Sequence, residues 1–167
     1  NLTFTATLSA ASGQIVTVGV ASADGTAIAA SGLGQNDYEA LAATLTFPAG
    51  TTTRTFNVAI NGDAVLEPTE TFTVTLSGAV NATIATATAT GTITNDDAQP
   101  TITILNASSP EGSAAASGLL NFGIRLSAPS LTTVTVRFST AGGTATSGVD
   151  FQPQSNILIS FSPGITV

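Results

Sequence analysis

The residues of this sequence that could do chemistry are its acids. The chain has ten Asp and Glu residues against three Arg, with no Lys, His or Cys, and its net charge is −7. Without His or Cys a typical zinc or copper site is excluded, whereas Ca²⁺ takes about six to eight oxygen ligands and suits carboxylates on loops. Six of the acids fall in three segments of the first 97 residues, and these are Asp37, Asp63, Glu67, Glu70, Asp96 and Asp97.

The elements that must position these acids are strands. Charged residues are only 8% of the chain, and Thr, Val and Ile, which suit a pleated sheet, are abundant, so we expect a folded, all-β protein. No segment keeps a helical period. Alternation of apolar and polar residues predicts strands near 2–8, 14–21, 43–47, 53–60, 70–77 and 84–94, and then near 101–106, 118–126, 132–139 and 156–161.

If successive strands alternate in direction, the three acidic segments meet. The segment with Asp37 follows the strand at 14–21, the segment with Asp63 to Glu70 follows that at 53–60, and Asp96 follows that at 84–94. Each pair of carboxylates about 8 Å apart repels by roughly 0.5 kcal/mol even in water, and a divalent cation would relieve this repulsion. Singly, each acid is an ordinary turn residue; their convergence favours a cation site.

The chain contains an internal repeat. Residues 2–27 align without a gap with residues 120–145, at an offset of 118. A repeat slightly longer than about 110 residues has the size of an immunoglobulin-like sandwich. We therefore expect a first repeat at 1–97 that lacks its strand A, a short linker at 98–100, and a second repeat at 101–167 with strands A to D only. By the same direction argument, Glu111 and Asp150 share one end of the second repeat.

Several motifs together are similar to one known family. They are NDY at 36–38, TLTFPAG at 44–50, the run from Asp63 to Phe72, GTITNDD at 91–97, SSPEGS at 108–113 and GTATSGVDF at 143–151. This set resembles the Calx-beta domain family, whose members occur in sodium–calcium exchangers, in an integrin β subunit and in large bacterial surface proteins.

The resemblance implies a fold and a ligand. It implies immunoglobulin-like antiparallel sandwiches in tandem, with Ca²⁺ bound at the distal loops beside the following domain. The ligands that it implies are Asp37, Asp63, Glu67, Glu70, Asp96 and Asp97 in the first repeat, and Glu111 and Asp150 in the second. The family's acidic runs here contain or adjoin Asn61 and Asn95, which suggests one or two weakly bound ions.

Charge and composition exclude several functions. The negative charge argues against nucleic acid and anionic membranes as partners, and no apolar run approaches the roughly 20 residues of a membrane span. Nucleophile systems that need His or Cys are excluded, and the carboxylates have no aromatic sugar platform beside them, so we expect no enzyme.

The leading hypothesis is a structural, calcium-stiffened repeat of a secreted, extracellular surface protein, adhesin or filament. Its partners would be neighbouring repeats of the same protein and, in a fibre, other copies. Two alternatives stay open. One is a calcium-sensing regulatory module, which would need tighter binding than a stiffener. The other is a calcium-independent spacer or filament subunit that neighbouring copies complete by strand exchange.

Overall fold

The computed structural model describes residues 1–30, 32–33, 36–111 and 118–167. It divides into two compact units: unit 1 comprises residues 1–63 and 67–97, and unit 2 comprises residues 64–66 and 98–167. One change of unit falls between Asp97 and Ala98, beside the linker expected at 98–100; the repeat boundaries themselves stay predictions. Within the described ranges, no helix is long and apolar enough to cross a membrane.

All ten predicted strands are present. They are β1 (Leu2–Thr7), β2 (Val16–Ala23), β3 (Ala42–Phe47), β4 (Thr53–Val58), β5 (Glu70–Val80), β6 (Thr88–Ile93), β7 (Ile102–Ile104), β8 (Ile124–Leu126), β9 (Val134–Phe138) and β10 (Ile157–Phe161). The largest differences are at two N-terminal ends: β6 begins at Thr88 instead of 84, and β8 begins at Ile124 instead of 118. The reason is that registered pairing with β5 and with β7 covers only these shorter stretches.

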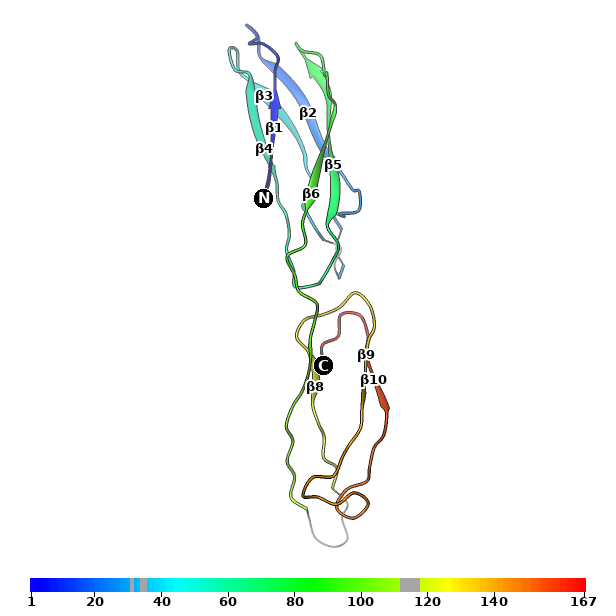
Figure 1. Ribbon diagram of the computed structural model, residues 1–167. Coiled ribbons are helices and arrows are strands. Elements are labelled where there is room, and N and C mark those ends of the chain that lie inside the picture. The colour runs from blue at the N-terminus through cyan, green and yellow to red at the C-terminus, as the bar shows by residue number, and fades with distance from the viewer. Residues whose placement is uncertain (31, 34–35, 112–117) are drawn as a thin grey trace. The chain divides into compact units, whose positions relative to one another are not determined.

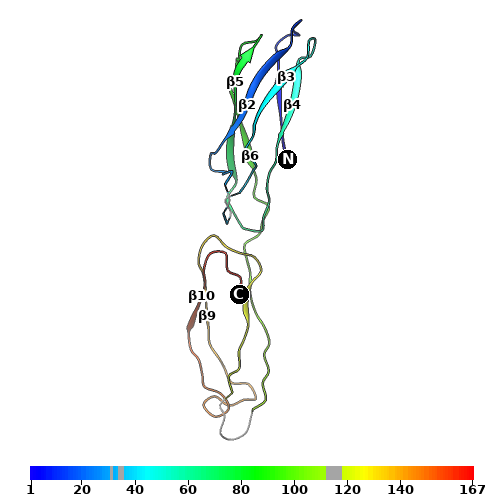
Figure 2. The same ribbon diagram turned by 180° about the vertical axis from the view of Figure 1, so that it is seen from behind.

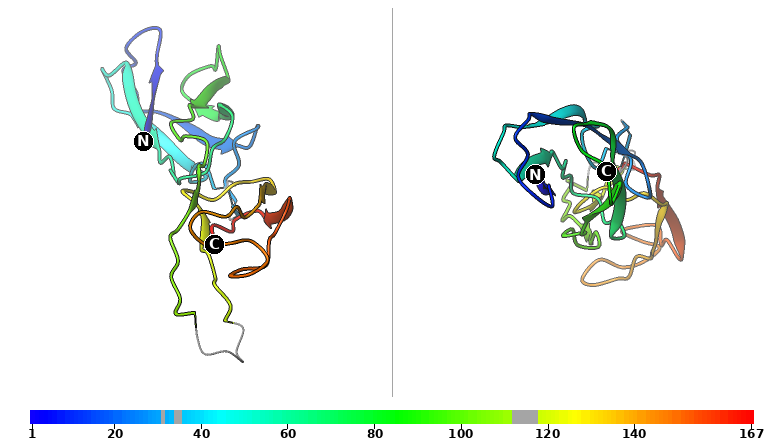
Figure 3. Two further views of the ribbon diagram at one scale, coloured as in Figure 1. Left: turned by 60° about the horizontal axis from the view of Figure 1, so that its bottom comes forward. Right: turned by 90° about the horizontal axis from the view of Figure 1, so that it is seen from above.

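Unit 1 is an antiparallel sandwich of two sheets. One sheet is the β1–β4 pair and the other has the order β3–β2–β5–β6. In Figure 1 and Figure 2 the strands of each sheet run side by side, and Figure 3 shows the β1–β4 pair (blue and cyan) again from two further directions. The predicted all-β, immunoglobulin-like fold class is confirmed.

The core of unit 1 lies between these sheets. Strand β2 points Val16, Val18 and Val20 inward, and all three are buried, as the period of two predicts. On β5 the same alternation buries Phe72, whose ring stacks on Tyr38 with centroids 4.3 Å apart. Tyr38 is itself only 1% exposed. The residue directly before it, Asp37, is therefore held against the core.

The strand directions bring the acidic segments to one end. Every strand pair in unit 1 is antiparallel, as the direction argument assumed. The last residue of β2, Ala23, pairs with Thr73 near the start of β5, and Glu70 pairs with Ile93 at the end of β6. The segments after β2, before β5 and after β6 consequently lie at the same end of the sandwich.

Unit 2 repeats the register of unit 1. Its described strands form two antiparallel pairs, β7–β8 and β9–β10. Val134 pairs with Phe161, as Val16 pairs with Phe47 in unit 1. The turn bond from Gly164 N to Ser130 O likewise has a counterpart in the bond from Gly50 N to Ser12 O. The internal repeat therefore extends from the sequence to backbone pairing.

Candidate metal centre

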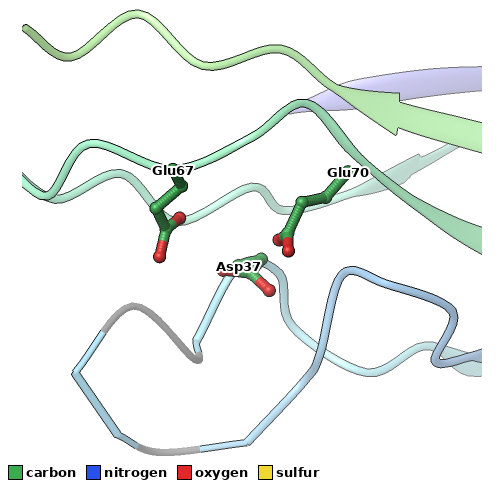
Figure 4. A group of neighbouring side chains, drawn as sticks. All are labelled: Asp37, Glu67 and Glu70. Atoms are coloured by element: carbon green, nitrogen blue, oxygen red, sulfur yellow. The ribbon is translucent and has the colours of Figure 1, made fainter. Parts of the chain in front are cut away.

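Three carboxylates converge at the end of unit 1. Asp37, Glu67 and Glu70 each offer an oxygen atom, and these three atoms lie within 4.8 Å of one another. Figure 4 shows Glu67 and Glu70 reaching from one segment towards Asp37, which comes from a facing loop. Ca²⁺ holds its oxygens at about 2.3–2.6 Å, so the oxygens of one coordination sphere are at most about 5 Å apart. The three atoms thus already fit around a single ion of this size.

Backbone hydrogen bonds hold Asp37 in place. Its N–H donates to Ile28 O (3.0 Å), and its carboxylate Oδ2 accepts from Ile28 N (2.7 Å). Its own carbonyl accepts from Asn61 N (2.9 Å), which ties the loop to the segment after β4. The residue is 7% exposed. A buried carboxylate held in this way is pre-positioned as a ligand, since little of its freedom remains to be lost on binding.

Asn95 links the two remaining segments. Glu67 N donates to Asn95 Oδ1 (3.1 Å), and Asn95 Nδ2 donates to the carbonyl of Asp97 (2.9 Å). One amide side chain therefore connects the approach to β5 with the residues that follow β6. The sequence analysis noted Asn95 only as a departure from an acidic run and missed this role; its position beside Asp96 was the available signal.

The six predicted acids of the first repeat line one small cavity. Its volume is about 50 Å³, more than the roughly 10–15 Å³ that a cavity needs to hold one water. Besides Asp37, Glu67 and Glu70, it is lined by Asp63, Asp96 and Asp97, and by Asn36, Asn61 and Asn95. The structure thus brings together the whole predicted set, although whether each member is a ligand stays a prediction.

The carboxylates disturb one another electrostatically. Burial, with the Asp37 charge and hydrogen bond and then the Glu67 charge, raises the pKa of Glu70 from 4.5 to about 7. Burial also raises the pKa of Glu67, and the charges of Asp37, Asp63 and Asp97 add to this effect. Like charges in a partly desolvated site favour the neutral acid. A bound divalent cation would reverse this preference, because it stabilises the ionised form.

The acids predicted for the second repeat lie apart from any such cluster. Asp150 is exposed, and its Oδ2 accepts from Thr146 N (2.6 Å), which closes a local turn. Glu111 is exposed as well. Among the described residues, the only group of three or more potential ligands is that of Asp37, Glu67 and Glu70. Residues 101–167 contain no counterpart of 63–97, the stretch that supplies most of the acids in unit 1.

The donor set selects the kind of metal. Carboxylate and amide oxygens line the cavity, and the chain has no Cys or His. Hard cations such as Ca²⁺ prefer oxygen ligands of this kind, whereas structural zinc prefers Cys and His. The residues present therefore fit the predicted Ca²⁺.

Comparison with known proteins agrees with this fold. The Calx-beta domain model matches residues 3–98 and again residues 96–167. No curated protein matches the chain. Two solved tandem structures are similar in fold: the calcium binding domain CBD12 of CALX1.1 is 19% identical with a TM-score of 0.51, covering 98% of this chain, and CBD12 from CALX1.2 is 18% identical with a TM-score of 0.53, covering 99%.

The chain is shorter than these tandem structures. It spans 65% and 64% of their lengths. The apo form of the Calx CBD1 domain also matches, at 27% identity and a TM-score of 0.44, over 50% of this chain and 72% of that domain. Because the family model accounts for nearly the whole sequence as two successive copies, the chain belongs to the Calx-beta domain family.

Proposed function

We propose that this chain is a calcium-binding structural module of an extracellular surface protein, adhesin or filament. The observation that carries the proposal is the convergence of Asp37, Glu67 and Glu70 at one end of unit 1. Solved neighbours described as calcium binding domains support the choice of ion. We expect no enzymatic activity.

The ion would act as a cross-link between loops. Asp37, Glu67 and Glu70 would hold it, and Asp63, Asp96 and Asp97 line the same cavity. The bound Ca²⁺ supplies two positive charges that offset the mutual repulsion of these carboxylates. Asn95 joins Glu67 to Asp97 by hydrogen bonds, so order imposed on Glu67 is passed to the backbone from which the chain continues into the next repeat. Less freedom there means a stiffer connection.

A weak site suits this role. The cluster has three close carboxylates, and one carboxylate oxygen of Asp37 already accepts a hydrogen bond from Ile28 N. Fewer free charged ligands mean lower affinity, and extracellular modules typically bind Ca²⁺ with dissociation constants of about 10⁻⁴–10⁻³ M. A site with an affinity in this range would be filled only at calcium concentrations of that order, so it suits the proposed extracellular location.

A calcium-sensing regulatory module is the second candidate. It is favoured by the tandem arrangement, which resembles the solved CBD12 pairs in fold. The two roles differ in affinity, because a sensor responds at about 10⁻⁷–10⁻⁵ M. Isothermal titration of the chain with Ca²⁺ decides between them: millimolar binding supports the stiffener, and micromolar binding supports the sensor.

The test of calcium binding uses a matched pair of variants. Glu70→Gln removes a member of the cluster, and Glu111→Gln makes the same chemical change at an exposed acid outside it. We expect Ca²⁺ to raise the thermal unfolding midpoint of the wild type and of Glu111→Gln, but not that of Glu70→Gln. Equal midpoints in Ca²⁺ and in chelator for the wild type would remove the ion from the mechanism and favour the calcium-independent spacer.

A further inference from the structure

Asn61 is the only asparagine of this chain that precedes a glycine; every other Asn precedes a residue with a side chain. Asn is chemically one of the less stable residues, because the backbone nitrogen of the next residue can attack its side-chain amide and close a cyclic imide. A Cβ on that next residue hinders the attack. Glycine has no Cβ and reaches backbone conformations that other residues avoid. The sequence therefore singles out Asn61-Gly62 for this reaction.

The structure leaves the attacking nitrogen accessible. Residues 61–69 form neither strand nor helix, Gly62 is exposed, and a Cβ built on it would meet nothing within 4 Å. Within the described residues, no group accepts a hydrogen bond from Gly62 N. Asn57 differs in this respect, because the residue after it is the buried Val58 of β4, which pairs with Leu2. Ring closure at Asn61 thus requires no strand to open.

The Asn61 side chain lies beside the acidic cluster. It lines the same cavity as the three clustered carboxylates. Its backbone N donates to Asp37 O (2.9 Å), and its Nδ2 donates to Asn36 Oδ1 and to Glu39 Oε1 (3.1 Å each). A negative charge that appeared on residue 61 would therefore act directly on the cation cavity.

We propose that Asn61 deamidates, and that the carboxylate so formed joins the cation cavity and tightens calcium binding as the protein ages. Gly62 N bonds to Asn61 Cγ, the Cγ–Nδ2 bond breaks, and the proton of Gly62 N–H leaves with Nδ2 as ammonia. Water then opens the imide at either carbonyl, which gives Asp or an isoaspartate whose backbone runs through the former side chain. Either product carries one new carboxylate, and the reaction needs only water.

The new charge changes the balance of the cavity. A carboxylate cannot donate, so both hydrogen bonds from Nδ2 are lost and a further anion faces Glu39. A unit charge about 5 Å from a divalent cation changes binding by about tenfold even in water, and calcium affinity rises with the number of charged ligands. This effect on calcium rests on the proposed function, whereas the deamidation itself does not.

The first experiment measures the reaction in the full chain, stored in chelator at alkaline pH and mapped by peptide mass spectrometry. Asn106, which is exposed and precedes Ala107, is the internal reference. We expect Asn61 to convert many times faster than Asn106, with isoaspartate among the products. Gly62→Ala should stop most of this conversion, and Gly13→Ala, whose Cβ also meets nothing within 4 Å, should not. Equal rates at Asn61 and Asn106, or an unchanged rate in Gly62→Ala, would overturn the proposal.

The second experiment measures calcium binding by isothermal titration. It compares the fresh chain, the aged chain purified by ion exchange, Asn61→Asp, and Asn106→Asp as the same change outside the cavity. We expect the aged chain and Asn61→Asp to bind Ca²⁺ about tenfold more tightly than the fresh chain, and Asn106→Asp to bind like the fresh chain. Binding by Asn61→Asp that is no tighter than that of Asn106→Asp would refute the gain of a ligand. Conversion at Asn61 with no calcium binding in any form would refute the proposed function and leave the modification site standing.

Discussion

Removing the Glu70 charge should stabilise the calcium-free protein at alkaline pH, although it removes a ligand. Glu70 has its pKa raised from 4.5 to about 7, with burial as the first cause and Asp37 as the second. A carboxyl group whose pKa is higher in the folded state favours folding while it is neutral. That contribution is fully present below the unfolded value and is lost as the pH rises through about 7.

The structure sets the size of this effect. One pKa unit corresponds to about 1.4 kcal/mol, so the complete shift from 4.5 to about 7 would lower the free energy of unfolding by at most about 3.5 kcal/mol. Glu70 is partly exposed, and solvent screens such interactions. We therefore expect the wild type in chelator to lose about 1–2 kcal/mol between about pH 5 and about pH 8. Glu67, whose pKa is also raised, adds to the loss in the same direction.

Urea unfolding followed by tyrosine fluorescence measures this loss. The chain has one Tyr and no Trp, so the signal reports Tyr38, which lies in unit 1 beside the cluster. Glu70→Gln should keep only the smaller loss that Glu67 contributes, and at about pH 8 it should exceed the wild type in chelator by about 1–2 kcal/mol. With saturating Ca²⁺ the order of the two proteins should reverse, because the wild type alone keeps the complete set of ligands.

One result would refute this reasoning. If the wild type in chelator is as stable at about pH 8 as at about pH 5, burial and the neighbouring charges do not raise the pKa of Glu70 enough to matter. Glu111→Gln is the control, and it should follow the wild type at both values. The hydrogen bond from Tyr38 lowers the pKa of Asp24 below 3.8, so the contribution of Asp24 is lost only at more acidic pH and does not enter the comparison.

Three further substitutions test the packing that supports the site. Asn95→Ala removes the hydrogen bond donated by Glu67 N and the one donated to Asp97 O, so calorimetry should show Ca²⁺ binding weakened by about 1–2 kcal/mol. Unchanged affinity would mean that the Asn95 amide does not support the site. Gly91→Ala would place a Cβ 2.4 Å from the Phe72 ring, whereas the Cβ of Gly13→Ala would meet nothing within 4 Å. Urea unfolding should show that Gly91→Ala lowers the free energy of unfolding by about 1–3 kcal/mol and that Gly13→Ala changes it little. Equal free energies of unfolding for the two variants would contradict the close packing of Gly91 against Phe72. Tyr38→Phe keeps the stacked ring but loses the 2.7 Å bond to Asp24, so it should cost about 1–2 kcal/mol. Because this variant has no Tyr, its urea unfolding is followed by far-UV circular dichroism beside the wild type, and no cost would mean that water replaces the bond fully.

The alternation of apolar and polar residues in the sequence was sufficient to predict the strands, and strand directions then predicted that the acidic segments of unit 1 lie at one end. Val16, Val18 and Val20 alternate inward as their spacing predicts, and antiparallel pairing then brings Asp37 to Glu67 and Glu70. The sequence pattern could not predict the path of each loop, because a loop's path depends on single hydrogen bonds. Asn95, whose amide joins two segments, shows this limit.

The second repeat shows a related limit. Glu111 and Asp150 were predicted as ligands of the second repeat, and this stays a prediction; Asp150 closes a turn with Thr146, and neither acid belongs to a group of three potential ligands among the described residues. Strand directions can place a loop at one end of a sandwich. They cannot predict whether a carboxylate in that loop accepts a hydrogen bond from a nearby backbone N–H group. The short β8 has a similar origin, since strand length depends on how far the partner stays in register.

The stacking of Tyr38 on Phe72 has a consequence for the rate at which an ion leaves. A backbone movement that takes Asp37 out of the cluster would also draw its immediate neighbour Tyr38 from a position where it is 1% exposed. Exposing a fully buried side chain of this size costs up to about 3 kcal/mol, so the open loop is populated on the order of one part in a hundred. Exchange of the ion would then be coupled to local unfolding of the core. A site of modest affinity would in this way have a longer residence time than its equilibrium constant alone suggests.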